Sequence, residues 1–111
     1  MQLVRDKVPQ MLIVKGLNPD YRLLDVNDHN RYDLIRDKLA EVSGEAMKAI
    51  KSGNAEEALM ALANLMDVTT LAAKQYDITV SMLKQERDKK RATKGSFDNF
   101  TVLINANRPQ Y

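Results

Sequence analysis

The 111-residue sequence contains no cysteine, no tryptophan and a single histidine, His29. The absence of cysteine excludes disulfides, thiolate metal sites and a cysteine nucleophile. One histidine excludes a multi-histidine zinc site within one chain, and a Ser-His-Asp triad would depend on that residue alone. We expect His29 to be a loop or cap residue. With two Phe and four Tyr, the chain also lacks the aromatic platforms that single-strand nucleic-acid binders usually show.

Glycine, proline, excess charge and long apolar runs are scarce as well. Four glycines and three prolines argue against a turn-rich all-β fold, and a formal net charge of +2 does not by itself imply a polyanionic partner. The most apolar stretch, residues 58–73, is too short and too polar to span a bilayer. The opening residues contain no apolar signal core. We therefore expect a cytoplasmic protein that has no membrane segment.

The length fits a single domain over residues 1–111. We expect an N-terminal arm and loop over residues 1–27, in which 3–14 form a short helical or irregular segment and 21–26 are possible extended chain. A tail follows over residues 95–111. No proline occurs between Pro19 and Pro109, so the intervening chain is free to be helical.

Three helices are predicted in that stretch. The first opens at Asp28 or Asn30, both good N-cap residues, and ends at residues 52–54. Its apolar residues recur at steps of three and four, which favours a helix with one apolar stripe: Tyr32, Ile35, Leu39, Val42, Ala46 and Ala49. Asn54 is positioned to cap a second helix over 55–76, and Thr79 to cap a third over 80–91.

The second helix is apolar nearly all round between residues 58 and 66, where Asn64 is the polar exception. A helix without a polar face must be covered on every side, and one short chain supplies only part of that cover. A second subunit is the simplest cover for the rest. The fold class we predict is therefore all-α: a helical hairpin with a third helix, assembling into a dimeric four-helix-type bundle, as a homodimer or a dimer of dimers.

Two pairs of polar residues are candidates for chemistry. Glu41 and Glu45 are four residues apart on one face of the first long helix, and Asn64 and Asp67 interrupt the apolar second helix. An antiparallel hairpin brings both pairs to similar heights. Oxygen ligands from facing helices are typical of Mg²⁺ or Mn²⁺ sites, which in turn bind phosphates. The alternatives are a solvated face, on which Lys38 and Lys48 pair with the glutamates, and a hydrogen-bonded core role for Asp67.

A basic cluster occupies the end of the third helix, and two further cations stand near the start of the chain. Together these two groups supply the candidates for phosphate binding: Arg5, Lys7, Lys90 and Lys94. The alternative is that cations near a helix C-terminus only stabilise the helix dipole. Nucleic-acid binding is a weaker possibility, because the basic run is short and has no interleaved aromatic residues.

Taken together, these segments resemble the MazG-like, phosphoribosyl-ATP-pyrophosphatase-like all-α nucleotide pyrophosphohydrolases, in the branch with a Leu-Val-Arg-Asp-Lys-Ile-Pro-like arm. The resemblance runs over about residues 3–103. The segments that carry it are Leu3-Val-Arg-Asp-Lys-Val-Pro9, Asp20-Tyr-Arg-Leu-Leu-Asp25, Lys38-Leu39-x-Glu41-x-x-x-Glu45 and Lys90-x-x-x-Lys94-Gly-Ser-Phe97.

The resemblance implies hydrolysis of a nucleoside triphosphate to the monophosphate and pyrophosphate, with Mg²⁺ held by Glu-Glu-x-x-Glu and Glu-x-x-Asp motifs. Glu41 and Glu45 match the first motif, whose second Glu is Val42 in this chain. The second motif falls on Ala61 and Asn64, so it has lost its Glu and its Asp has become an amide. One turn on, Asp67 matches a position that is often acidic in the family.

Two functions follow as expectations. The first is a pyrophosphohydrolase of weak or altered activity that acts on a nucleotide-like small molecule. Its catalytic residues would be Glu41 and Glu45. Its Mg²⁺ or Mn²⁺ would be held weakly by Glu41, Glu45, Asn64 and Asp67. Glu57, one turn before Ala61, is a candidate to compensate in part. The second is an inactive nucleotide-binding or protein-interaction relative of the same fold.

Overall fold

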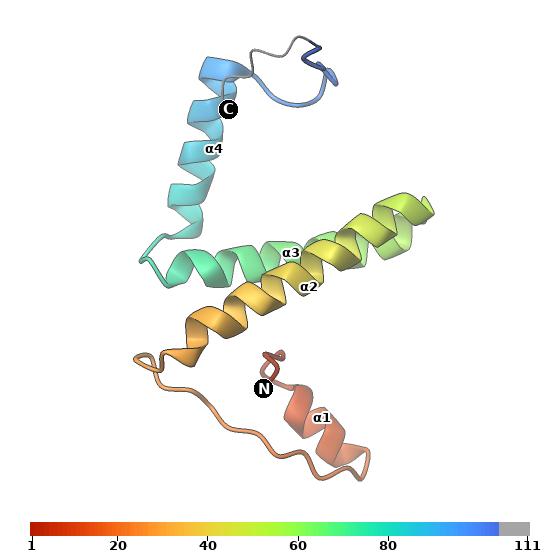
Figure 1. Ribbon diagram of the computed structural model, residues 1–111, viewed down its shortest axis with the longest axis vertical. Helices are drawn as coiled ribbons and strands as arrows, with labels where there is room; N and C mark the ends of the chain where they lie inside the picture. Colours follow the sequence, from red (N-terminus) through yellow and green to blue (C-terminus); the bar gives the residue numbers. More distant parts are fainter. Residues whose placement is uncertain (105–111) are drawn as a thin grey trace. The chain divides into compact units, whose positions relative to one another are not determined.

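The computed structural model describes residues 1–104, and over that range the chain has four α-helices and no strand (Figure 1). This confirms the all-α prediction. The helices are α1 (Val8–Val14), α2 (Asn30–Ser52), α3 (Ala55–Lys74) and α4 (Val80–Lys94). The chain divides into one compact unit over Met1–Asp77 and a second from Ile78 onward. The single-domain interpretation of the whole chain stays a prediction.

Helix α2 begins and ends at local signals that the sequence carries. His29 is its N-cap residue, as expected, but the side chain that bonds to the first turn belongs to Asp28, whose Oδ1 accepts from the Asn30 N–H at 2.9 Å. At the other end Gly53 adopts a left-handed conformation, with φ of 72°, and its N–H donates to the Ile50 carbonyl. Glycine takes this conformation without the steric cost of a Cβ, so the helix ends there.

The connection from α2 to α3 is very short. The Asn54 side chain accepts a hydrogen bond from the Glu57 N–H at 3.1 Å, which confirms the predicted N-cap. Helix α3 then runs antiparallel to α2. The far ends of the two helices also meet, since the rings of Tyr32 and Tyr76 have centroids 6.4 Å apart. The predicted helical hairpin is therefore present.

The seam between α2 and α3 consists of small and branched side chains. Its centre is a buried cluster of Ala46, Ala49 and Ala61, against which Ala58 and Leu65 pack. Val42, on α2, is 3% exposed. Alanines at a helix contact allow the two backbones to approach closely, which brings side chains at the rim of the seam within reach of each other.

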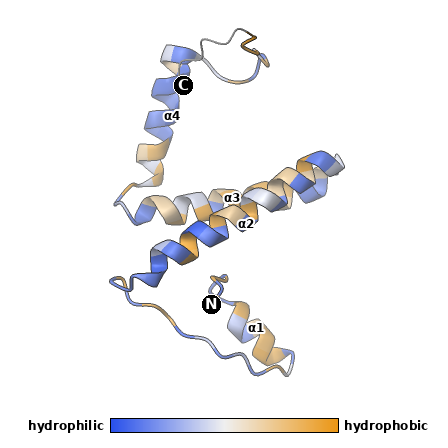
Figure 2. Cartoon of the chain, in the orientation of Figure 1, coloured by the Kyte–Doolittle hydropathy of each residue, from blue (hydrophilic) through white to orange (hydrophobic). Residues whose placement is uncertain are grey.

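Large apolar side chains remain exposed on both helices of the hairpin. We call one set of them the apolar outer face: Met47, Ile50, Leu59, Leu62 and Met66. Figure 2 shows hydrophobic residues along both α2 and α3. Nothing in residues 1–104 covers the outer face fully, and Leu59 and Met66 are 70% and 72% exposed.

The segments outside the hairpin are shorter or less regular. Helix α1 falls inside the expected 3–14 segment, and Pro9 lies in its first turn. Residues 21–26 form no strand, and a turn follows at 26–27. In the second unit Thr79 caps α4 through a 3.1 Å bond from the Met82 N–H, as predicted, and α4 extends to Lys94.

Residues 100–104 are irregular and exposed, and the end of the expected tail, residues 105–111, lies outside the described residues. None of the four helices in the described part of the chain has the length and apolar character needed to cross a membrane.

Candidate functional site

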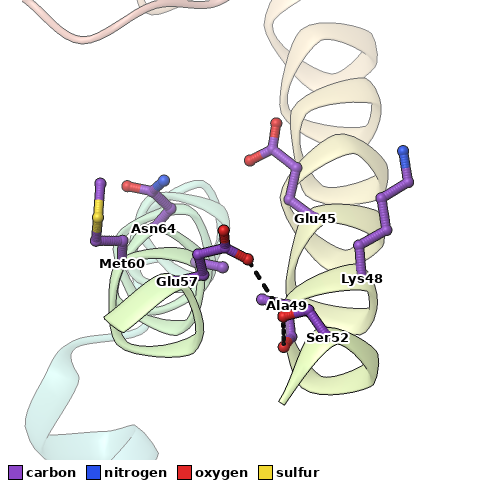
Figure 3. A pocket seen from close by; sticks show the side chains of 8 residues that line it. Glu45, Lys48, Ala49, Ser52, Glu57, Met60 and Asn64 are labelled. Carbon is purple, nitrogen blue, oxygen red and sulfur yellow. Dashed lines mark hydrogen bonds between the residues drawn. The ribbon is translucent and has the colours of Figure 1, made fainter. Parts of the chain in front are cut away.

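An open pocket of about 460 Å³ lies on the hairpin near the α2–α3 connection (Figure 3). Both helices contribute to its wall, which carries two acids, an amide, a hydroxyl and a cation among apolar groups. Its lining residues are Glu45, Lys48, Ala49, Ser52, Glu57, Met60, Ala61 and Asn64. Helix geometry, at about 100° per residue, places these residues roughly opposite the apolar outer face on each helix. The hairpin thus has a polar side and an apolar side.

Two carboxylates and one amide line this pocket from two helices. Glu45 comes from α2, whereas Glu57 and Asn64 come from α3, two turns apart. No hydrogen bond or ion pair within residues 1–104 holds the Glu45 carboxylate. It is therefore available to a ligand. The predicted meeting of the first acidic helix with the polar positions of the second is present for Glu45 and Asn64.

Glu57 is anchored by the turn that joins the helices. Its backbone N–H donates to Asn54, and its Oε2 lies 3.2 Å from the Ser52 hydroxyl. That hydroxyl has one proton, which it donates either to Glu57 or to the Ala49 carbonyl at 2.7 Å (Figure 3). Glu57 lies in the first turn of α3, where a negative charge interacts favourably with the helix dipole. From that position its side chain also lines the pocket. Ser52 and Lys48 were not among the predicted site residues.

Glu41 does not line the pocket. Its carboxylate pairs with Lys38, one turn earlier on α2, at 3.2 Å. This i,i+3 pair is the solvated-face arrangement that the sequence allowed as an alternative for Glu41. The role predicted for Glu41 in metal binding and catalysis stays a prediction.

Asp67 and Asn64 share one partner, the guanidinium of Arg5. Its Nη1 donates to Asp67 Oδ2 and its Nη2 to Asn64 Oδ1, both at 2.7 Å. Arginine has donors and no acceptor, so the Asn64 atom that faces it must be the carbonyl oxygen. The Asp67 side chain is 64% exposed, so the alternative of a core acid is wrong. A predicted phosphate-binding residue thus pairs with two predicted metal ligands.

The two positions at which the family's motifs would carry further carboxylates are buried in the seam. Val42 and Ala61 are 3% and 8% exposed, and Ala61 of α3 clusters with Ala46 and Ala49 of α2. A carboxylate at either position would need a cation or several donors to offset its desolvation. In this chain both positions carry apolar side chains instead.

The remaining basic candidates lie on exposed surface. Lys7 is the N-cap residue of α1. Lys90 and Lys94 belong to α4, in the second unit, and Lys94 is engaged in an interaction of its own. Their phosphate-binding role stays a prediction.

The pocket offers hard oxygen donors but few of them. Residues 1–104 contain no group of three or more His, Asp or Glu side chains placed to hold a metal ion. Two carboxylates and an amide oxygen nevertheless match the ligand chemistry of Mg²⁺, which commonly completes its shell with waters and substrate phosphates. The residues present therefore fit a divalent cation that is held jointly with a phosphate-bearing ligand.

Comparisons with protein-family models, with curated proteins and with solved structures found no match to this chain. The resemblance to MazG-like proteins therefore remains an expectation that rests on the sequence motifs.

Proposed function

We propose that this protein is a cytoplasmic, Mg²⁺-dependent nucleotide pyrophosphohydrolase that works as a homodimer. The observation that carries the proposal is the meeting of Glu45 from α2 with Glu57 and Asn64 from α3 in one open pocket. Hydrolysis of a phosphoanhydride needs anionic oxygens to hold a divalent cation and to orient a water molecule. This pocket is where residues 1–104 bring such oxygens together from two helices.

The reaction is the attack of a water oxygen on the α-phosphorus of a nucleoside triphosphate. The bond from that phosphorus to the oxygen bridging to the β-phosphate breaks, pyrophosphate leaves, and the water's proton passes to a carboxylate of the pocket. When bound, Mg²⁺ supplies positive charge that neutralises the phosphates. Glu45 and Glu57, with the Asn64 carbonyl oxygen, would hold it. Lys48, which lines the pocket, and Arg5, which bonds to Asn64, would balance further phosphate charge.

The apolar outer face supports the homodimer. A contiguous set of large exposed apolar side chains on a soluble domain marks an interaction surface. A second copy of the hairpin presents the same face, so the two hairpins can cover each other in a four-helix arrangement. The polar pocket on the opposite side would stay open to substrate.

Pyrophosphate release from a panel of ribo- and deoxyribonucleoside triphosphates, with Mg²⁺ and the full-length protein, tests the activity. We expect turnover in the wild type and a loss of roughly 100-fold or more in Glu45→Gln, because that carboxylate is unpaired and faces the pocket. Glu56→Gln is the matched control, since Glu56 stands beside Glu57 in the first turn of α3 but does not line the pocket. No release at high enzyme and Mg²⁺ concentration would refute the proposed activity.

A second candidate function is a nucleotide-binding relative without hydrolysis. The observation in its favour is that Val42 and Ala61 are packed in the seam where the motifs would place carboxylates. A divalent cation bound by fewer anionic oxygens is held more weakly. This candidate predicts that a nucleotide with Mg²⁺ raises the melting temperature while no pyrophosphate appears.

A further inference from the structure

The Arg5 guanidinium joins the start of the chain to α3, 59 and 62 positions later in the sequence. Its two terminal nitrogens each donate to a different side chain, one to Asn64 and one to Asp67, which lie three residues apart on α3. Within the first unit, extensive helix packing is limited to α2 against α3, so α1 packs little against the hairpin. Arg5 therefore supplies a polar link between the segment 1–7 and the hairpin.

In this link the positive Arg5 guanidinium and the negative Asp67 carboxylate neutralise each other. A guanidinium is the side chain best suited to bind a phosphate, and a carboxylate is the side chain best suited to bind a divalent cation. While they remain paired, Asp67 offers reduced negative charge to a cation, and Arg5 has two of its five N–H donors engaged. Asn64, which also lines the pocket, ties this ion pair to the pocket rim.

We infer that the contact of Arg5 with Asn64 and Asp67 is an autoinhibitory clasp that opens when a phosphate-bearing ligand and a divalent cation arrive together. This inference rests on the proposed function, because Asn64 belongs both to the clasp and to the lining of the pocket. On opening, Arg5 pairs with the phosphate and Asp67 with the cation. Total charge is conserved in this exchange, since two oppositely charged pairs become two other oppositely charged pairs.

The exposure of the clasp makes it displaceable. Arg5 and Asp67 are 62% and 64% exposed, so water screens their attraction. An exposed pair of this kind stabilises a structure by at most about 1 kcal/mol, which corresponds to at most about a five-fold effect on a competing equilibrium. A buried pair would be too strong for a ligand to displace readily, whereas this one sets a low threshold.

Binding of Mn²⁺ alone to the full-length protein, followed by the electron paramagnetic resonance signal of free Mn²⁺, tests the clasp. We expect Arg5→Gln to bind Mn²⁺ about two- to five-fold more tightly than the wild type, because Asp67 is released. Arg22→Gln is the matched control: it also removes one guanidinium, but that group contacts the Met1 Sδ atom and, within residues 1–104, pairs with no acid. It should leave Mn²⁺ affinity close to that of the wild type.

A double-mutant cycle assigns the gain to Asp67. In an Asp67→Asn background, Arg5→Gln should give no gain, because the carboxylate that it would release is absent. Replacing chloride by sulfate at equal ionic strength should raise Mn²⁺ affinity in the wild type, where the anion can take Arg5, and leave Arg5→Gln unchanged. An Arg5→Gln protein that gains nothing, a gain shared by Arg22→Gln, or a gain that survives in Asp67→Asn would each overturn the clasp.

The clasp and the proposed reaction fail in different ways. If no nucleotide is hydrolysed but Arg5→Gln still gains Mn²⁺ affinity through Asp67, the reaction is wrong and the clasp stands. If nucleotides are hydrolysed and Arg5→Gln gains nothing, the reaction stands and the clasp is wrong.

Discussion

The inner seam and the apolar outer face of the α2–α3 hairpin differ in the size of their side chains. The seam centres on three alanines, Ala46, Ala49 and Ala61, whereas the outer face carries methionine, leucine and isoleucine. A hairpin that folded for its own stability alone would be expected to bury its largest apolar side chains. Here the largest ones lie outside.

That inversion suggests a division of roles between the two sides. Small residues in the seam let α2 and α3 approach closely, so Glu45 and Asn64 face one pocket across the helices. Large residues outside leave apolar area that a second subunit can bury, at a gain of roughly 25 cal/mol for each Å² removed from water. The seam thus arranges the candidate site, and the outer face is expected to supply much of the stability through assembly.

The largest expected effect comes from placing a charge in the seam. Val42→Glu places a carboxylate at a position that is 3% exposed. Without a cation, a buried carboxylate costs several kcal/mol, a large part of the stability of a small domain. We expect loss of cooperative unfolding in urea, monitored by far-UV circular dichroism.

Ala40→Glu is the control for Val42→Glu, because Ala40 is exposed on the same helix. It should change the free energy of unfolding by less than about 0.5 kcal/mol. Equal stability of the two variants would show that the seam at Val42 admits water. Recovery of Val42→Glu upon addition of Mg²⁺ would support a metal at that position.

Charging the outer face should instead break the assembly. The double variant Leu59→Glu, Met66→Glu places two acids on a surface that is already solvated within one hairpin. We expect the dimer to dissociate in sedimentation velocity, and the melting temperature to fall and lose its dependence on protein concentration. The control is Val14→Glu on α1, which changes a similarly exposed apolar residue outside the hairpin. It should leave the molecular mass measured by sedimentation at that of the wild type. A wild type that sediments as a monomer would contradict the role of this face.

Local sequence signals were enough to predict the hairpin. Gly53, Asn54 and Thr79 act through bonds to neighbours within four residues, so their roles follow from residue type and spacing. The apolar stripe of the first long helix placed Val42 in the core for the same reason. The possible extended segment 21–26 is no strand, because a strand needs a partner to satisfy its backbone and none forms within residues 1–104.

The site was predictable only in part. Glu45 and Asn64 meet because an antiparallel hairpin with a short connection fixes their heights, which the sequence indicated. Arg5 contacts Asp67 across 62 positions that include α1, a long irregular loop and α2, and no local pattern predicts a contact at that sequence separation. The sequence left open whether Glu41 pairs with Lys38 or faces the pocket, because the spacing of the two residues on one helix allows both, and in the structure the pair forms.

The smallest expected effects come from substituting two glycines of the hairpin. The two variants distinguish the stability of a single hairpin from the stability that the dimer adds. At Gly53 the φ of 72° makes Gly53→Ala cost about 1 kcal/mol in any state of association. Gly44 lies inside α2, and, apart from its chain neighbours and the helix's own backbone, no atom of residues 1–104 lies within 4 Å of where a Cβ would stand. In a lone hairpin Gly44→Ala should therefore stabilise by about 0.5–1 kcal/mol, through higher helix propensity. Urea unfolding over a range of protein concentrations measures both. If Gly44→Ala instead lowered the free energy of unfolding, and only at protein concentrations at which the dimer forms, the partner subunit would contact Gly44. The interface would then extend beyond the apolar outer face.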